Sequence, residues 1–240
     1  MILWRLTLTG LDDTVPFREV VDLFDRDPRI ELGILFSDTR AGAEGRYPDH
    51  RWIEVFTEEL STVTPPRLAL HVCGGARKRL LAAGALEGFS ALRHFDRVQL
   101  NGVFDAGDTL TLARLLASPA RSPAIITQHD ANPSFAQALA SPRHQILFDA
   151  SGGHGIVRST WPPVLREKRC GYAGGLGPEN LAQELTRIAA AAGSHSVWID
   201  MESSLRDARD HFSLEAAHRV VDLVHAWEQS CDTAKVPHRA

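Results

Sequence analysis

Buried strands and helical segments alternate along this chain. Eight short apolar runs begin near residues 3, 30, 67, 97, 123, 145, 169 and 196. Helical patterns cover residues 17–24, 52–60, 77–86, 109–116, 134–139, 181–192 and 214–227. Continuous apolar strands that alternate with helices are typical of a parallel sheet whose outer face is covered. Eight such units predict a closed (β/α)8 barrel, the TIM barrel of the α/β class.

The length of the chain and the sequence after its first strand favour a single barrel over the alternative fold. An open doubly wound sheet is the alternative fold, but no G-x-G-x-x-G fingerprint follows the first strand. A chain of 240 residues fits one barrel. We therefore expect a single barrel domain over residues 1–228 and a flexible C-terminal tail over residues 229–240.

A run of glycines within residues 172–180 joins the seventh strand to the helix that follows. Gly174, Gly175 and Gly177 permit positive φ angles and leave the backbone uncovered. Pro178 favours the start of a helix. Bare amides at such a turn can hold an anion, and barrel enzymes commonly bind phosphate after strands seven and eight. The alternative interpretation is a tight turn that binds nothing.

Composition and charge exclude several classes of function. The net charge is -4 without a basic stripe, whereas nucleic-acid binders concentrate positive charge. Three widely spaced cysteines form neither a disulfide framework nor a zinc pattern, so we expect a reducing compartment and no metal; we also expect no cofactor. Residues 1–5 are too short an apolar run for a signal peptide, and no run approaches a membrane-spanning length. The sequence predicts a cytoplasmic protein that binds neither nucleic acid nor membranes.

Motifs at five strand ends share a family resemblance. They are Arg46-Tyr47, V-Q-L-N-G over 98–102, F-D-A-S-G-G-H-G over 148–155, A-G-G-L-G-P-E-N over 173–180 and I-D-M-E-S-S over 199–204. They resemble phosphoribosylanthranilate isomerase, the tryptophan-biosynthesis barrel that rearranges an aminoaldose to an aminoketose. The resemblance covers much of the chain, and its most specific motif is the one at 173–180. It implies an isomerase that acts on a phosphorylated ribosylamine.

The resemblance also implies roles for individual residues. An Amadori rearrangement needs a general acid at the ring oxygen of the ribose and a general base at the adjacent carbon. The family's acid, the aspartate of strand six, corresponds to Asp149, and its base, a cysteine at the end of strand one, corresponds to Thr9. The residues implied to bind the substrate or its phosphate are Arg46, Gly153, Gly174, Gly175, Asp200, Ser203 and Ser204.

Departures at strands one and eight change the expected chemistry. The hydroxyl of Thr9 is not a useful proton acceptor near pH 7, and Thr7 stands where the family has a lysine. Glu202 follows strand eight beside the expected phosphate site. Its charge would repel an anion unless Arg206 or another cation neutralises it. Either the substrate differs or the site has been rebuilt.

Two other strand ends offer a replacement base. Cys73 ends strand three, and a lowered pKa would make it a base or a nucleophile. His71 lies on the same face of that strand. His129 ends strand five, where a histidine can do acid–base work near neutrality. The alternatives are a small buried thiol at Cys73 and a hydrogen-bonded core histidine at His71.

Three hypotheses for the function follow. The first is an isomerase with Asp149 as the general acid. The second is a different reaction on a related phosphosugar, with His71, Cys73 or His129 as the base. The third is a binding protein that retains the phosphate site without chemistry. In each, the partner is a small phosphorylated sugar derivative, and we expect a monomer or a homodimer.

Overall fold

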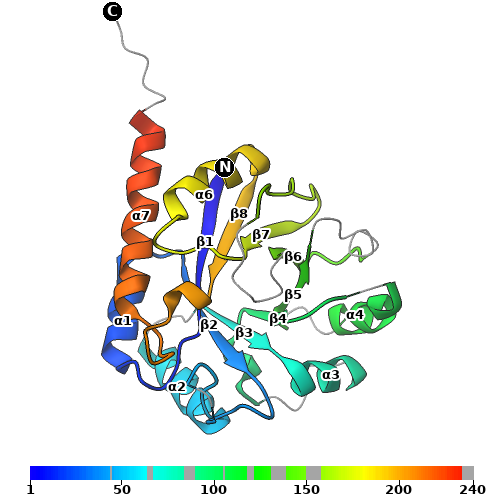
Figure 1. Cartoon of the computed structure of the whole chain (residues 1–240). Helices are drawn as coiled ribbons and strands as arrows, with labels where there is room; N and C mark the ends of the chain where they lie inside the picture. The colour runs from blue at the N-terminus through cyan, green and yellow to red at the C-terminus, as the bar shows by residue number, and fades with distance from the viewer. Residues whose placement is uncertain are drawn as a thin grey trace, which may run out of the picture.

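The eight apolar runs form eight parallel strands that close into one barrel, which confirms the predicted fold (Figure 1). The structure is a computed structural model and describes residues 1–43, 45–63, 67–83, 90–104, 106–117, 122–130, 139–149 and 158–233. The strands are β1 Ile2–Thr9, β2 Ile30–Phe36, β3 Leu68–Val72, β4 Arg97–Leu100, β5 Ala124–His129, β6 His144–Asp149, β7 Arg169–Ala173 and β8 Ser196–Met201. Each begins within one residue of its predicted start.

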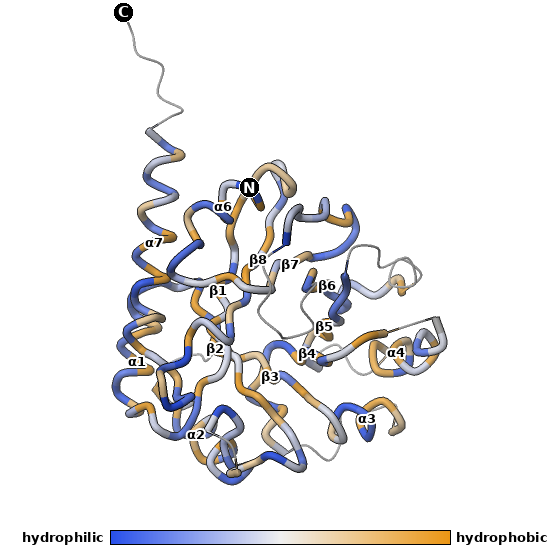
Figure 2. The backbone as a smooth tube through the Cα atoms, viewed as in Figure 1, coloured by the Kyte–Doolittle hydropathy of each residue, from blue (hydrophilic) through white to orange (hydrophobic). Residues whose placement is uncertain are grey.

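Helices surround the barrel and bury apolar faces against it. They are α1 Phe17–Arg26, α2 His50–Val63, α3 Gly74–Ala83, α4 Thr109–Leu116, α6 Leu181–Ala192 and α7 Leu214–Thr233, with short 3-10 turns η1 Ser90–His94, η2 Ala106–Asp108 and η3 Ser203–Leu205. Figure 2 shows hydrophobic and hydrophilic positions mixed along these helices, as amphipathic helices require. The buried residues of α1, for example, are Val20, Leu23 and Phe24.

The ends of two helices differ from the prediction. α3 begins at Gly74 rather than near Arg77, because the chain turns directly from β3 into the helix. α7 continues to Thr233 instead of ending near residue 227. Trp227 donates from Nε1 to Thr186 Oγ1 of α6 at 3.0 Å, which holds the later turns against the neighbouring helix. Residues 229–233 of the expected tail are therefore helical. Residues 234–240 and most of the predicted helix 134–139 lie outside the described residues.

The main hydrophobic core lies between the strands and the helices, whereas the barrel interior combines polar residues with a small apolar cluster of Ile126, Leu147, Ala173 and Trp198. On β4, Val98 and Leu100 belong to the outer core. The alternate residue Arg97 points inward and donates from Nε to Glu31 Oε2 at 2.8 Å and from Nη1 to Gln145 Oε1 at 3.1 Å. The strands are thus buried on both faces, as predicted, but the inner face carries the polar residues that build the site.

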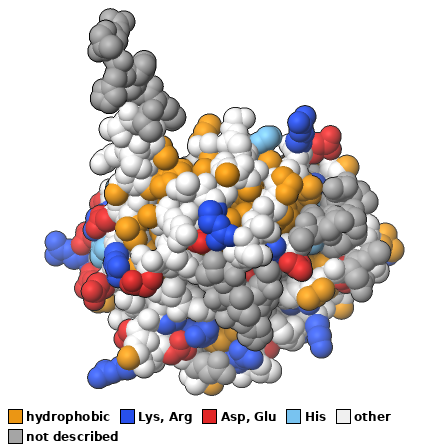
Figure 3. All heavy atoms as spheres, turned by 45° about the horizontal axis from the view of Figure 1, so that its top comes forward, with side chains coloured by type: hydrophobic (Ala, Val, Ile, Leu, Met, Phe, Trp, Pro, Cys, Tyr) orange, Lys and Arg blue, Asp and Glu red, His pale blue; other side chains and the backbone are white. Residues whose placement is uncertain are grey.

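Charged side chains of both signs are interspersed on the face that Figure 3 shows. Hydrophobic side chains gather in the upper part of that view, beside α7. A search of the described helices finds none that combines the length and the apolar character needed to cross a membrane.

Candidate functional site

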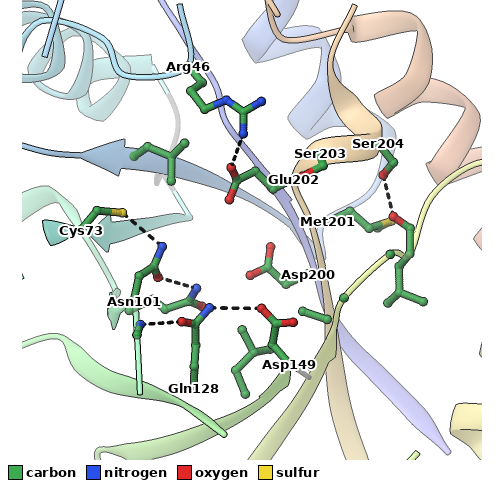
Figure 4. Close-up of a pocket in the computed structure, with 18 of the residues that line it drawn as sticks. Arg46, Cys73, Asn101, Gln128, Asp149, Asp200, Met201, Glu202, Ser203 and Ser204 are labelled. Atoms are coloured by element: carbon green, nitrogen blue, oxygen red, sulfur yellow. Dashed lines mark hydrogen bonds and ion pairs between the residues drawn. The ribbon is translucent and has the colours of Figure 1, made fainter. Parts of the chain in front are cut away.

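A cavity of about 690 Å³ opens at the carboxyl ends of the strands, where barrel enzymes carry their active sites (Figure 4). Strand ends and the loops after them supply its wall. The polar and charged residues that line it are Arg40, Arg46, Tyr47, Cys73, Gln99, Asn101, Gln128, Asp149, Asp200, Glu202, Ser203 and Ser204. The pocket therefore brings together most of the residues that the sequence predicts for the site.

Asp149 ends β6 and points into the pocket (Figure 4). Its side chain is 8% exposed. Gln128 of β5 donates from Nε2 to Asp149 Oδ2 over a long 3.4 Å, and its own Oε1 accepts from the Gly102 N–H at 2.8 Å. The Gly102 amide thus orients Gln128, which in turn contacts Asp149 from the neighbouring strand.

Asp200 of β8 points into the same pocket (Figure 4), and Thr9 at the end of β1 contacts it. Thr9 Oγ1 donates to Asp200 Oδ1 at 2.7 Å, and the Thr9 side chain is fully buried. Gly33 pairs with Thr9 in the barrel, and a Cβ there would come within 2.2 Å of the threonine oxygen. Burial raises the pKa of Asp200 to about 7, against the opposing Thr9 hydrogen bond and with a further rise from the charge of Glu202. Asp200 therefore titrates where a general base works best.

A chain of donors leads from β4 to Thr9. Gln99 Nε2 donates to His71 Nδ1 at 3.1 Å, so Nε2 of His71 carries the proton. That nitrogen lies 3.5 Å from Thr9 Oγ1. Burial, and then the charge of Arg97, lower the pKa of His71 to about 3. His71 is thus a neutral supporting residue of the barrel interior.

The glycine turn after β7 presents free backbone donors to the pocket. Gly174 and Gly175 have φ angles of 101° and 67°, a region that favours glycine. Both line the pocket, and within the described part of the chain neither N–H donates to another group. Asn180 closes the turn, since its Oδ1 accepts from the Gly177 N–H at 3.0 Å and its Nδ2 donates to the Gly175 carbonyl at 2.8 Å. The helix begins only after this turn, at Leu181.

The turn is tied to the loop after β8. Ser204 Oγ donates to the Leu176 carbonyl at 2.6 Å. A Cβ on Gly177 would lie 2.4 Å from Ser204 Cβ, so this close approach requires glycine. Ser203, the other serine of the predicted phosphate site, lines the pocket at the start of η3. The two loops expected to share a phosphate are therefore held side by side.

Arg46, predicted to contact the substrate, is held by carboxylates. Its Nη1 donates to Glu202 Oε1 at 3.1 Å (Figure 4). It also makes two bonds to Asp210, from Nε at 3.0 Å and from Nη2 at 2.6 Å. Burial raises the pKa of Glu202, while Arg46 and then Arg206 act in the opposite direction. The cation that pairs with Glu202 is thus Arg46, and Arg206 is bonded instead to Asp12 at 2.9 Å.

Cys73 reaches the pocket in a form that does not favour catalysis. Its Sγ accepts from Asn101 Nδ2 at 3.2 Å. Burial, followed by the negative charge of Glu202, raises the pKa of the thiol to about 11. The thiolate is therefore scarce near neutrality.

His129 is not among the described residues that line the pocket. Thr127 and His129 face away from the barrel interior, and Thr127 Oγ1 lies 2.7 Å from His129 Nε2 and 2.9 Å from His144 Nε2. Burial lowers the pKa of His129 to about 4. Gly153, the remaining predicted phosphate ligand, lies outside the described residues. The described residues contain no group of three or more His, Cys, Asp or Glu side chains that could hold a metal ion.

Two features of the site were not predicted from the sequence. One is the contact between Thr9 and Asp200, which are 191 residues apart and meet because β8 pairs with β1. The other is the pair of glutamines, Gln99 and Gln128, that orient neighbouring side chains. The alternation of inward and outward side chains along each strand could have identified these residues, since each stands at an inward position.

Comparisons with known proteins place the fold. Neither a protein-family model nor a curated protein matches the sequence. Among solved structures, the phosphoribosyl anthranilate isomerase of Thermus thermophilus is 15% identical, with a TM-score of 0.61 over 92% of this chain and 98% of that one. TrpF of Jonesia denitrificans is 19% identical, with a TM-score of 0.59 over 93% and 98%. A phosphoribosyl anthranilate isomerase in complex with reduced 1-(o-carboxyphenylamino)-1-deoxyribulose 5-phosphate is 13% identical, with a TM-score of 0.56 over 94% and 100%. The chain is thus similar in fold to these barrels over nearly its whole length.

Proposed function

We propose that the protein is an isomerase that converts a phosphorylated ribosylamine from its aldose to its ketose form, with Asp149 as general acid and Asp200 as general base. One observation carries the proposal. Asp149, the last residue of β6, and Asp200, the residue before the last of β8, line one pocket with the free amides of Gly174 and Gly175, which follow the intervening β7. The fold similarity to phosphoribosyl anthranilate isomerases supports the same class of reaction.

The glycine turn supplies a site for the phosphate. Gly174 and Gly175 offer backbone donors that need no cationic side chain beside them. Ser203 lines the adjacent wall. A phosphate at this turn would leave the sugar to extend across the pocket toward Asp149 and Asp200.

The two carboxyl groups would then move protons in sequence. Asp149 gives a proton to the ring oxygen as the C1–O bond breaks, which leaves an open-chain iminium ion. Asp200 takes the proton from C2, and the released electron pair forms an enolamine between C1 and C2. Protonation at C1 and loss of the proton on O2 then yield the ketose and restore both carboxyl groups, so the substrate gains and loses no proton overall.

Asp200 is a better base than the other candidates. Its pKa of about 7 lets it hold and release a proton near neutrality. Thr9, at the position of the family's base, donates to Asp200 and so places the carboxylate beside that position. Cys73 carries a thiol with a raised pKa, and His129 faces away from the barrel interior.

Exchange with solvent tests the reaction directly. N-substituted ribosylamine 5-phosphates, formed in situ from ribose 5-phosphate and primary amines, are incubated with the protein in D₂O and followed by NMR. We expect ketose labelled at C1 with the wild type, and a rate about 10²–10⁴ lower with Asp149→Asn or Asp200→Asn. Asp25→Asn, an exposed carboxylate on α1, is the matched control.

The outcome separates catalysis from binding. No turnover and no exchange with any amine of the panel, anthranilate included, would refute the isomerase. If ribose 5-phosphate then still stabilised the fold, by about 2.7 kcal/mol at 100-fold above its Kd, the binding protein would take its place.

A further inference from the structure

The donors of Arg46 are largely taken up by the chain itself. Glu202 accepts from Nη1, and Asp210 accepts from both Nε and Nη2. One guanidinium group thus faces two carboxylates. An anionic group of a ligand that approached Arg46 would have to compete with both, and it would meet a surplus of negative charge.

The rest of the pocket wall carries more carboxylates than cations among the described residues. Asp149, Asp200 and Glu202 line it together with only two guanidinium groups among the described residues, those of Arg40 and Arg46. Arg40 donates from Nη1 to the Tyr47 hydroxyl at 3.1 Å.

An unsatisfied buried oxygen supports the same conclusion. Gln99 lines the pocket and is 2% exposed, yet among the described residues its Oε1 has no hydrogen-bond partner, while its Nε2 donates to both His71 and Asn101. A buried acceptor without a donor costs free energy, which a donor from a ligand would recover. This oxygen is separate from the carboxylates, and a ligand group that donates a hydrogen bond would satisfy it as well.

We infer that the part of the pocket beside Arg46 selects a neutral or cationic substituent that donates hydrogen bonds and rejects a carboxylate, with Glu202 and Asp210 as the residues that set this preference. The inference rests on the proposed function, because it takes the phosphate to lie at Gly174 and Gly175. The inferred substrate class is a ribosylamine phosphate whose nitrogen substituent bears a carboxamide, amidine or similar hydrogen-bond donor and no carboxylate.

Binding of stable analogues tests this without turnover. Three N-aryl 1-amino-1-deoxyribitol 5-phosphates, which differ only in a carboxylate, carboxamide or amidine on the ring, are titrated calorimetrically into the full chain. We expect wild-type protein to bind the carboxamide and the amidine at least about tenfold more tightly than the carboxylate, a difference of about 1.4 kcal/mol.

Two variants assign the preference to its residues. Glu202→Gln and Asp210→Asn each release donors of Arg46, and we expect either change to reduce the tenfold preference to about threefold or less, mainly through tighter binding of the carboxylate. Asp25→Asn removes the same charge from the surface and is expected to keep the preference. Circular dichroism checks that each variant is folded. If one of the two variants does not fold, the other still tests the assignment.

Each result has a single meaning. Equal or tighter binding of the carboxylate by the wild type overturns the inference, and leaves the proposed function in place because the phosphosugar still binds. A preference that survives both Glu202→Gln and Asp210→Asn overturns the assignment to these residues. Failure of all three analogues to bind removes the phosphosugar itself, and the inference with it.

Discussion

The two ends of the barrel interior are both polar, but they differ in how many of their polar groups are left for a ligand. At the amino end of the strands, Arg97 bonds to Glu31, Thr7 and Gln145 and lies 4.6 Å from the ring centroid of Trp198. At the carboxyl end, Asp149, Asp200 and Glu202 share a pocket that also has free backbone donors. Polar residues inside a barrel therefore do not by themselves mark a site. What distinguishes the carboxyl end is the set of groups left for a ligand to satisfy.

The largest effect that we expect is a loss of stability at the amino end of the strands. Arg97→Met leaves the Glu31 carboxylate fully buried without its cation. The free energy of unfolding should fall by about 3–5 kcal/mol, as measured by urea denaturation. Arg26→Met, which breaks the exposed pair with Asp222, is the control and should cost no more than about 1 kcal/mol. Equal costs for the two variants would contradict the view that the Arg97–Glu31 pair is a closed structural unit.

The second prediction concerns the protonation of the Asp200 carboxyl group. Its pKa in the folded state, about 7, lies above the ordinary 3.8, so the folded chain keeps this proton when the unfolded chain has lost it. The contribution of Asp200 to stability is therefore full below about pH 4 and falls as the pH rises to 7 and beyond. Asp200→Asn removes this fall.

Unfolding in urea at pH 5 and pH 8 measures that difference. Relative to the wild type, Asp200→Asn should gain stability between the two pH values, by an amount on the order of 2 kcal/mol. Turnover should be lost at both. A stability difference that does not change with pH would show that the Asp200 carboxyl is not held in its protonated form.

A smaller effect is expected at Thr9. Thr9→Val removes the donor to Asp200 Oδ1, which stabilises the ionised carboxylate, so the pKa of Asp200 should rise further. The pH at which kcat/KM reaches half its maximum should move up by roughly one unit, corresponding to about 1.4 kcal/mol. Thr9→Ser keeps the hydroxyl and should restore the wild-type profile. An unchanged profile in Thr9→Val would mean that Thr9 does not position the base.

The hydrophobic pattern was sufficient for the fold, since apolar strands of four to eight residues have few ways to be buried between helices. The glycines of residues 172–180 were sufficient for the conformation of the Gly174–Gly175 turn, which is local to one loop. The sequence pattern could not supply the contacts of Arg46 with Glu202 and Asp210, which are 156 and 164 residues away. Those contacts depend on loops that meet only when the barrel closes.

The face of the strand on which a side chain lies determined whether His129 could belong to the site. On β5, Gln128 lines the pocket, while Thr127 and His129 face the outside of the barrel. A shift of one residue would have exchanged them. The sequence marks where β5 ends but not which of its last two residues faces inward, so His129 was a reasonable candidate that the geometry does not favour.

The smallest effect is expected at Cys73, the other candidate for the missing base. Its thiol lines the pocket, but with a pKa of about 11 it is protonated near neutrality and accepts from Asn101 Nδ2. A serine hydroxyl can accept the same bond, so Cys73→Ser should change kcat by less than about threefold, far below the 10²–10⁴ expected for a general base. Isomerisation measured beside Asp200→Asn gives the comparison. A hundredfold loss in Cys73→Ser together with an active Asp200→Asn would assign the general base to Cys73, at the end of β3, instead of to Asp200 on β8.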